Sequence, residues 1–562
     1  MKILPAKRLT RLLMKPLLTG FMAIALLPLF AQTETDKSFE TVKHLDIFYS
    51  LYKEVDLFYV DELDPSKTIG TAIDAMLESL DPYTVYITES EIEDLRFMTT
   101  GEYGGVGALI RKHNEFVVIS EPYENYPAQK AGLRAGDAIV SIDGKSMKDK
   151  NTSDVSELLK GQPNTVVKLL IRRPGVENDM EFSLTRMEIK IPSVPHYQLL
   201  EGNIAYIQLS SFTNTAASEV KDAFLELKKD KELKGVILDL RGNPGGLLIE
   251  AVKICNIFVD KGQTVVSTKG KVAQWDKTYL TTDTPVDAGI PLVVLVNRGS
   301  ASASEIVSGC IQDLDRGVIV GQRTFGKGLV QTTRDLSYNT KLKVTTAKYY
   351  IPSGRCIQAL DYTHRNEDGS VGRVPDSLVS EFSTLHGRKV YDGGGVLPDI
   401  VTETETFSNI AVSLLAKNII FDFATWFVNN NPTIADAGSF TIDEKIYADF
   451  LSFIADKDFD YKTETEEQLN EMIETAQKEK YYDVAAQELE ALKLKFAHDK
   501  NKDLQIFKSE ISELIGDEIV HRYYYQKGRT QYMMKYDKEL QAAIDVINDS
   551  VRYQSILSGT RK

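Results

Sequence analysis

Three short segments of this 562-residue chain carry side chains that could do chemistry together. In Asn297-Arg-Gly-Ser-Ala-Ser-Ala-Ser-Glu305, which lies between an apolar run and a helical pattern, Ser302 could be a nucleophile at a helix N-terminus. The positive end of a helix stabilises an alkoxide, and the next backbone N–H, that of Ala303, faces the same point. Ser302 and Glu305 also match a capping box, which is a complete structural explanation. Spacing alone leaves both interpretations open.

The second segment, Asp239-Leu-Arg-Gly-Asn-Pro-Gly-Gly246, follows a run that predicts a buried strand. Two adjacent glycines let backbone N–H groups turn toward one point without a Cβ in the way, which suits a developing oxyanion. An ordinary glycine turn is the alternative.

The third segment is Thr324-Phe-Gly-Lys-Gly-Leu-Val-Gln331, where Lys327 stands between two glycines. A turn between two glycines does not need a long cationic side chain, so Lys327 suggests a side chain directed at a particular group. Gln331 could orient it through an amide hydrogen bond. The spacing of a phosphate-binding loop, G-x-x-x-x-G-K-[ST], is not met here. No serine has the G-x-S-x-G pattern of an α/β-hydrolase elbow.

The elements around these segments predict an α/β core. Apolar strands alternate with helices, so the three segments fall at strand ends, where α/β proteins bind their ligands. The predicted strands are 203–209, 235–240, 290–296, 318–321, 329–333 and 341–350, and the predicted helices are 216–229 and an amphipathic 302–313.

The pattern of apolar and polar residues divides the rest of the chain into regions. Residues 32–100 show helical spacing and predict a helical N-terminal domain, in which Asp81-Pro82 stops the second helix. Residues 101–187 are short β-rich runs with one helix, 153–160, and predict a compact β module. Residues 188–405 hold the α/β core, and residues 406–562 are helical and charged.

The N-terminus has the composition of a secretory signal. Five basic residues precede an apolar run from 16 to 30, with no acidic residue before Glu34. This predicts a signal peptide over residues 1–31, cut after Ala31. An uncleaved anchor is the alternative, although the run is shorter than the roughly 20 residues of a bilayer span. Either way we expect an exported protein, periplasmic or membrane-associated on the outer side.

Composition argues against several classes of partner and cofactor. The net charge of −15 makes nucleic acid an unfavourable partner. Three widely spaced cysteines give no disulfide framework, and the seven scattered histidines form no metal-ligand spacing. We therefore expect neither a metal nor a cofactor.

The three segments, in this order, resemble the C-terminal processing peptidases, or tail-specific proteases, which are serine peptidases with a Ser–Lys dyad. Further matches are Leu80-Asp-Pro82, Tyr103-Gly-Gly-Val-Gly107, Ala131-Gly-Leu-Arg-Ala-Gly-Asp137 and Gly393-Gly-Gly-Val-Leu-Pro-Asp399. Together they place the resemblance over residues 40–405.

The resemblance implies roles for particular residues. Ser302 would be the nucleophile, Lys327 the general base and Gln331 its orienting partner. The pKa of a free lysine is about 10.4, so the site would have to lower it, and Phe325, Leu329 and Ile306 are candidates to bury the amine. The N–H groups of Ala303 and of Gly245 or Gly246 would hold the oxyanion.

The β module looks like a PDZ domain, which captures peptide C-termini by strand addition. A nest formed by Gly104, Gly105, Val106 and Gly107 would bind the terminal carboxylate. Helix 153–160, with Val155, Leu158 and Leu159, would close the groove. The expected partners are proteins or peptides with exposed, hydrophobic C-terminal tails.

Two other functions stay open. One is a non-catalytic PDZ peptide-binding protein on a peptidase scaffold. The other is an acyl-transfer enzyme, because the expected crotonase/ClpP-like core is shared with the crotonases and a fold does not fix a reaction. We assign no catalytic role to the helical tail after residue 405. Its runs of charged residues are interpreted as solvated helix faces. Its length motivates a hypothesis of a homo-oligomer or an adaptor contact through these helices.

Overall fold

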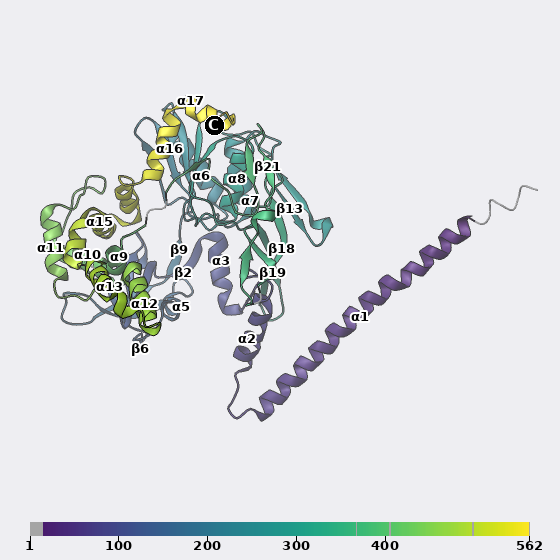
Figure 1. Cartoon of the computed structure of the whole chain (residues 1–562), viewed down its shortest axis with the longest axis horizontal. Helices are drawn as coiled ribbons and strands as arrows, with labels where there is room; N and C mark the ends of the chain where they lie inside the picture. The colour runs from purple at the N-terminus through teal and green to yellow at the C-terminus, as the bar shows by residue number, and fades with distance from the viewer. Residues whose placement is uncertain (1–14, 367, 404–405, 497–498, 561–562) are drawn as a thin grey trace, which may run out of the picture. The chain divides into compact units, whose positions relative to one another are not determined.

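The computed structural model describes residues 15–366, 368–403, 406–496 and 499–560. It divides into two compact units, Met1–Pro82 and Tyr83–Lys562 (Figure 1). Of the predicted signal peptide, residues 1–14 lie outside the described residues.

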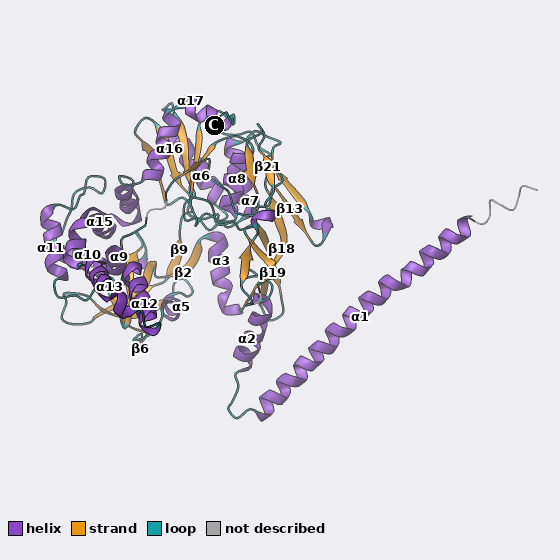
Figure 2. Cartoon of the chain, viewed as in Figure 1, coloured by secondary structure: helices purple, strands orange, loops and turns teal. Residues whose placement is uncertain are grey.

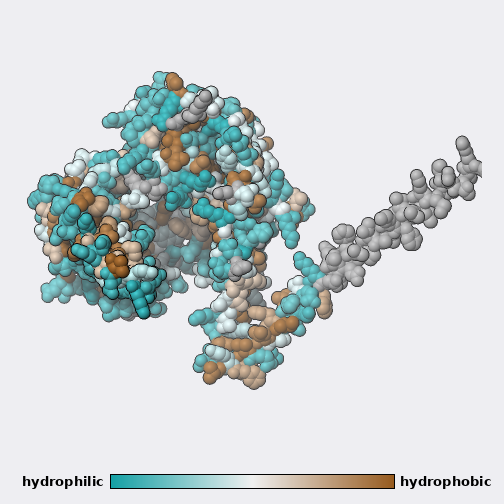
Figure 3. All heavy atoms as spheres, viewed as in Figure 1, coloured by the Kyte–Doolittle hydropathy of each residue, from teal (hydrophilic) through white to brown (hydrophobic). Residues whose placement is uncertain are grey.

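The described part of the first unit consists of two helices, α1 (Lys15–Phe58) and α2 (Pro65–Glu78). Asp64 caps α2, its carboxylate accepting the N–H groups of Ser66 and Lys67 at 2.9 and 3.3 Å. Helix α2 ends at Glu78, three residues before the Asp81-Pro82 pair at which the sequence predicts its end. The apolar side chains of Leu45, Phe48 and Val55 are exposed, and Figure 3 shows hydrophobic residues on the surface of this unit.

Residues 83–100 belong to the second unit, although the sequence predicts a helical domain that runs to residue 100. They form β1 (Val85–Ile87), a short 3-10 turn (Glu89–Glu91) and α3 (Ile92–Thr100). Strand β1 pairs antiparallel with β18 (Lys341–Tyr350). Helical periodicity cannot reveal a strand whose partner lies so far along the chain.

The β module has its own sheet and core. Its sheet runs in the order β3-β4-β5-β7-β8, with β6 beside β5, while β2 and β9 form a separate antiparallel pair. Valines, isoleucines and leucines from the sheet and from α5 fill the core. The chain between β2 and β3 includes Gly107, whose φ of 75° suits glycine. The elements are β2 (Glu102–Gly105), β3 (Ala108–His113), β4 (Phe116–Pro122), α4 (Pro127–Lys130), β5 (Ala138–Ile142), β6 (Lys145–Ser146), α5 (Thr152–Leu159), β7 (Val166–Arg172), β8 (Met180–Thr185) and β9 (Met187–Lys190).

The α/β core is built on a six-stranded sheet in the order β10-β11-β12-β15-β16-β23. Strand β10 is antiparallel to β11, and the neighbouring pairs from β11 to β23 are parallel. Figure 2 shows these strands between helices. The strands are β10 (His196–Leu200), β11 (Ile204–Gln208), β12 (Gly235–Asp239), β15 (Leu292–Val296), β16 (Val318–Gly321) and β23 (Ile400–Val401).

Helices cover both faces of this sheet. On one face, α6 (Ala216–Lys228), α7 (Leu248–Phe258) and α8 (Ala303–Asp313) bury a large apolar cluster. The other face is covered by the end of the chain, α16 (Lys538–Asn548) and α17 (Ser550–Leu557). The end of the helical tail is therefore a layer of the α/β core.

A second sheet and several short hairpins complete the core. The second sheet has the order β1-β18-β13-β14, with β17 paired to β18. These remaining elements are β13 (Thr264–Gly270), a 3-10 turn (Ala273–Trp275), β14 (Lys277–Leu280), β17 (Leu329–Asp335), β19 (Leu360–Arg365), β20 (Val371–Arg373), a 3-10 turn (Asp376–Leu378), β21 (Glu381–Ser383) and β22 (Lys389–Tyr391).

The helical region before α16 has an aromatic-rich core of its own, which includes Phe423 and Phe450. Within the described residues no single helix is long and apolar enough to cross a bilayer. The bent pair α9 and α10 passes that test by length and composition. Its Leu414, Ile420 and Phe423 lie in this core, whereas Val412 and Trp426 are exposed. The helices are α9 (Asn409–Ala416), α10 (Ile419–Asn430), α11 (Glu444–Ile454), α12 (Glu464–Lys478), α13 (Tyr482–Phe496), α14 (Lys500–Ile506) and α15 (Lys508–Met533).

Side chains of the helical region also contact the β module. Asp422 of α10 accepts from His113 of β3 at 2.8 Å. On α15, His521 pairs with Glu121 of β4 at 2.9 Å. Helix α15 is kinked at Tyr525, which has φ 52° and ψ −161°.

Candidate active site

The three chemical segments follow three neighbouring parallel strands, β12, β15 and β16. The carboxyl ends of parallel strands meet at one edge of a sheet, so the segments converge there. This is the placement that the sequence predicts. Helix α8 follows the segment that holds Ser302, and all of its residues are buried, so it is a core helix and not the amphipathic one expected.

Ser302 stands at the start of α8 in a strained conformation. Its φ of 55° and ψ of −110° are rarely adopted by a residue other than glycine. Hydrogen bonds on both sides hold it there: its N–H donates to Glu305 at 2.8 Å and its carbonyl accepts from Ile306 at 3.0 Å. The predicted capping box with Glu305 is present. Ser302 itself is half-buried.

Glu305 does more than cap the helix. Its fully buried carboxylate accepts four hydrogen bonds: Oε1 from the Thr324 hydroxyl (2.6 Å) and the Gly326 N–H (2.7 Å), and Oε2 from the N–H groups of Ser302 (2.8 Å) and Lys327 (2.9 Å). One carboxylate oxygen therefore joins the backbones of the predicted nucleophile and base. Burial raises the pKa of Glu305 to about 7, although the four hydrogen bonds favour the charged form.

Tyr349 of β18 makes a second bridge between the same two residues. Its hydroxyl lies 2.6 Å from the Lys327 carbonyl oxygen and 3.0 Å from that of Ser302. Burial raises the pKa of Tyr349 well above its usual value, so the hydroxyl keeps its proton for donation. Glu305 thus holds the two N–H groups and Tyr349 the two carbonyls. The sequence gives no signal for Tyr349, and it indicates only a capping role for Glu305.

The surroundings of Lys327 differ from those expected. The amine lies over the ring of Tyr83, 4.1 Å from its centroid, and the side chain is half-buried. Leu329 and Ile306 are buried as expected, but Phe325 is 47% exposed and shields little. An aromatic face attracts the ammonium form, whereas the base role requires the neutral amine.

Gln331 lies on β17 at a register shift between Val330 and Gln331. Its side-chain amide donates to the Thr345 hydroxyl at 3.2 Å. A bulge of this kind re-aims a side chain. Its predicted role in orienting Lys327 stays a prediction.

The two glycines of the second segment lie against Ser302. A Cβ on Gly245 would stand 2.9 Å from the Ser302 Cβ and 2.9 Å from the Ala303 nitrogen, so only glycine fits. The N–H of Gly245 already donates to Asn243 at 2.9 Å. Among the hydrogen bonds within the described chain, the N–H groups of Gly246 and Ala303 have no acceptor. As placed, these two are the available oxyanion donors.

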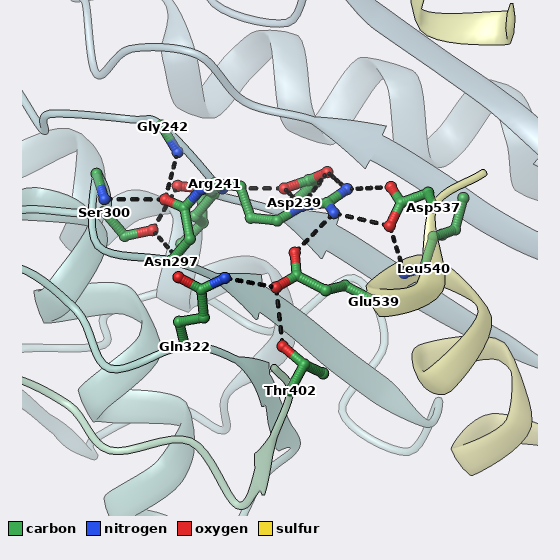
Figure 4. Close-up of polar contacts among 12 residues, drawn as sticks. Asp239, Arg241, Gly242, Asn297, Ser300, Gln322, Thr402, Asp537, Glu539 and Leu540 are labelled. Atoms are coloured by element: carbon green, nitrogen blue, oxygen red, sulfur yellow. Dashed lines mark hydrogen bonds and ion pairs between the residues drawn. The ribbon is translucent and has the colours of Figure 1, made fainter. Parts of the chain in front are cut away.

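Two asparagines join the second segment to the first. Asn297 Oδ1 accepts the N–H groups of Gly242 and Gly299 at 2.9 Å each (Figure 4). The Asn243 carbonyl accepts the N–H of Ala301 at 3.0 Å. The nucleophile and oxyanion segments are therefore fixed to each other.

The predicted peptide-binding residues lie between β2, β3 and α5. Strand β3 is an edge of its sheet, as strand addition requires. The Gly104 carbonyl accepts the Gly161 N–H at 3.1 Å, and a Cβ on Gly104 would lie 2.2 Å from the Gly161 oxygen.

The side chains expected to line this groove are mostly taken up by the module's core. Val106, Val155 and Leu159 are buried there, while Leu158 is half-buried. Gly105 pairs with Met187 of β9. Peptide binding by these residues stays a prediction.

Comparison with known proteins identifies relatives of each part. Peptidase family S41 matches residues 203–364, a PDZ domain matches 118–173, and the probable PDZ-protease C-terminal helical domain matches 410–547. A carboxy-terminal-processing protease of Bartonella bacilliformis is 38% identical over 353 residues, covering 61% of this chain and 79% of the relative. A probable CtpA-like serine protease of Staphylococcus aureus is 38% identical over 327 residues, covering 58% of this chain and 64% of the relative. Among solved structures, the photosystem II D1 C-terminal processing protease is 32% identical, covers 63% of this chain and 86% of its own, and has a TM-score of 0.36.

Proposed function

This chain belongs to the carboxy-terminal-processing proteases of serine peptidase family S41, and we propose that it is an exported endopeptidase that uses Ser302 and Lys327 as a catalytic dyad. Its PDZ domain would recognise the C-terminal tails of extracytoplasmic proteins. We further propose a crotonase/ClpP-like peptidase core and a location in the periplasm or on the outer side of the membrane. The N-terminal basic and apolar segment supports the location.

The observation that carries this proposal is the double bridge between Ser302 and Lys327. Glu305 binds both N–H groups and Tyr349 contacts both carbonyls. Two buried polar side chains form hydrogen bonds with backbone groups of the same serine and the same lysine. This arrangement supports a common catalytic role for the two residues. Preorganisation of this kind is what catalysis by a dyad needs.

The proposed reaction begins when the neutral Lys327 amine takes the Ser302 proton and Oγ attacks the peptide carbonyl. The N–H groups of Ala303 and Gly246 would stabilise the oxyanion, with Gly245 as the alternative donor. The lysine ammonium then gives its proton to the leaving amine, and water hydrolyses the acyl-enzyme. Gln331 would orient the lysine.

The Tyr83 contact sets a condition on this reaction. Because the ring stabilises the lysine ammonium, the amine must leave the ring face or lose its proton when a peptide enters. The geometry with Lys327 over Tyr83 is therefore a resting form of the proposed dyad.

The decisive experiment is degradation of an unfolded or tail-exposed polypeptide by the purified protein. We expect Ser302→Ala and Lys327→Ala each to abolish cleavage and a metal chelator to have no effect. Full activity in either variant rejects the dyad. Binding of tail peptides without any cleavage by the wild type would favour the alternative, a non-catalytic PDZ peptide-binding protein.

The C-terminal helices were also a candidate surface for an adaptor or a second copy, and this stays a proposal. Helices α16 and α17 cover the chain's own sheet, so such a partner would bind the earlier helices. Replacement of the exposed Val484 and Leu494 of α13 by Asp with the assembly state unchanged would count against such a contact.

A further inference from the structure

The start of α16 reaches the catalytic edge of the sheet. The Arg241 guanidinium donates to Asp537 at 2.6 and 2.9 Å and to Glu539 at 2.9 Å. Asp239, at the end of β12, accepts from the same guanidinium at 2.6 Å (Figure 4). Three carboxylates from two distant parts of the chain therefore converge on one arginine.

Arg241 stands at the root of the oxyanion segment. Its own N–H donates to Asp239 at 2.9 Å, and the next N–H, that of Gly242, donates to Asn297. The Arg241 side chain is 18% exposed and that of Asp239 is 3% exposed. Bidentate arginine–carboxylate contacts fix both position and direction, so the clamp on the side chain also fixes the backbone from which Gly245 and Gly246 follow.

Glu539 extends the clamp to the lysine segment. Its second oxygen accepts from Gln322 at 3.3 Å and from the Thr402 hydroxyl at 2.8 Å. Gln322 directly follows β16 and begins the stretch that leads to Lys327. The same side chain thus touches the beginnings of both the oxyanion segment and the lysine segment.

Helix α16 is a firm support for these carboxylates. Asp537 also caps the helix, accepting the Leu540 N–H at 2.8 Å. Leu540, Ala543 and Val546 are buried against the sheet that ends in the catalytic segments. Because one face of α16 packs on the sheet, its acidic start cannot move without uncovering that face.

We propose that Asp537 and Glu539 are positioning residues of the peptidase, which hold the oxyanion and lysine segments in place through Arg241 and Gln322. The C-terminal helical region then contributes positioning residues to the active site. This inference rests on the proposed function, because it assigns residues to the same reaction.

The test compares two pairs of carboxylates. Asp537→Asn, Glu539→Gln and the double variant remove charge from the clamp with little change in shape. Asp517→Asn is the matched control: Asp517 forms a similar pair with Arg529 at 2.6 Å on α15 and contacts none of the catalytic segments. For each protein we would measure kcat and KM on a short peptide, Tm, and the rate of Ser302 labelling by a fluorophosphonate.

We expect the double variant to lose about 10 to 100-fold in kcat, less than the roughly 100 to 1,000-fold loss when an oxyanion donor is removed outright. KM should change by less than about threefold, and labelling should slow in parallel. The Tm of the double variant should match that of the control, which keeps wild-type kcat. Equal kcat in the double variant and the control would overturn the proposal. A loss of kcat that is accompanied by a proportionate loss of Tm in the double variant would overturn it as well.

Should the double variant not fold, Glu539→Gln alone decides. It keeps the Asp537 cap, and we expect about a tenfold loss in kcat, against which an unchanged kcat would overturn the inference. Wild type that neither cleaves nor labels would instead refute the proposed function. The two failures are therefore distinguishable.

Discussion

The peptidase site and the PDZ groove are held in different ways. At the peptidase site, buried side chains from distant segments hold the backbones of Ser302 and Lys327 by hydrogen bonds. In the groove, the glycine segment is held by backbone contacts, and strand β3 keeps an open sheet edge. Under the proposed function, this difference corresponds to a preformed dyad and to a binding edge that a bound peptide would complete.

The strongest way to break this contrast is to remove the Glu305 bridge. Glu305→Gln places an amide N–H₂ where two donors already point, so at least one N–H loses its acceptor. We expect kcat to fall about 100-fold and the free energy of unfolding to fall by about 1–3 kcal/mol. Peptide kinetics and denaturant unfolding measure the two effects.

Glu250→Gln is the control for this change. Glu250 is also buried and accepts the Ala217 N–H at 3.0 Å, but it contacts none of the catalytic segments. We expect it to lose stability without a specific loss of kcat. Similar kcat values in the two variants would mean that the Glu305 bridge has no catalytic role.

A change confined to the groove should have a smaller effect and a different one. Gly107→Ala places a Cβ 2.5 Å from the Tyr126 Cβ beside the expected carboxylate nest. We expect about a tenfold weaker Kd for a tail peptide, or about 1.4 kcal/mol, with short-peptide kcat unchanged. Gly132→Ala has a similar positive φ of 85° with nothing nearby, and it should bind tails normally. Equal tail affinity in both variants would argue against this nest.

The difference in stability between wild type and Glu305→Gln, followed with pH, isolates the contribution of Glu305. Its pKa is raised from 4.5 to about 7 in the folded protein, so the folded state holds the proton more tightly. The stabilisation is complete below pH 4.5 and is lost as the pH rises through 7. The difference in Tm between wild type and Glu305→Gln should therefore be larger at about pH 5 than at about pH 8, and the reverse order would contradict this burial effect.

The smallest expected effect concerns Tyr83. Tyr83→Leu removes the ring under the Lys327 amine, a contact worth about 0.5–2 kcal/mol. The acidic limb of the kcat/KM profile should shift to lower pH by about 0.4–1.5 units, because the ammonium loses its partner. Tyr83→Phe keeps the ring and should leave the limb in place. A shift to higher pH in the leucine variant would show that the ring does not stabilise the ammonium.

The sequence predicts those parts of the molecule whose causes are local. Strands 318–321 and 341–350 appear at the predicted residues, because runs of apolar and β-branched residues between turns specify them. Ser302 is placed at a helix start, and the three segments meet at one sheet edge. These features depend on neighbouring residues and on the order of strands.

What the sequence does not predict depends on distant partners. Tyr349, the Tyr83 ring under Lys327 and the clamp from Asp537 to Arg241 join residues that are far apart in the chain. Helix α16 has an ordinary amphipathic pattern, and nothing in that pattern says that its apolar face covers the peptidase sheet. Contacts of this kind come from tertiary packing, which periodicity does not record.

The central claim is that Ser302 is a nucleophile activated by Lys327. It is tested most directly by peptide mass spectrometry of the full chain after timed reaction with a fluorophosphonate. We predict a single adduct on Ser302 in the wild type, formed at least about 100-fold more slowly in Lys327→Ala. An adduct on another residue, or equal labelling rates in the two proteins, would contradict the account.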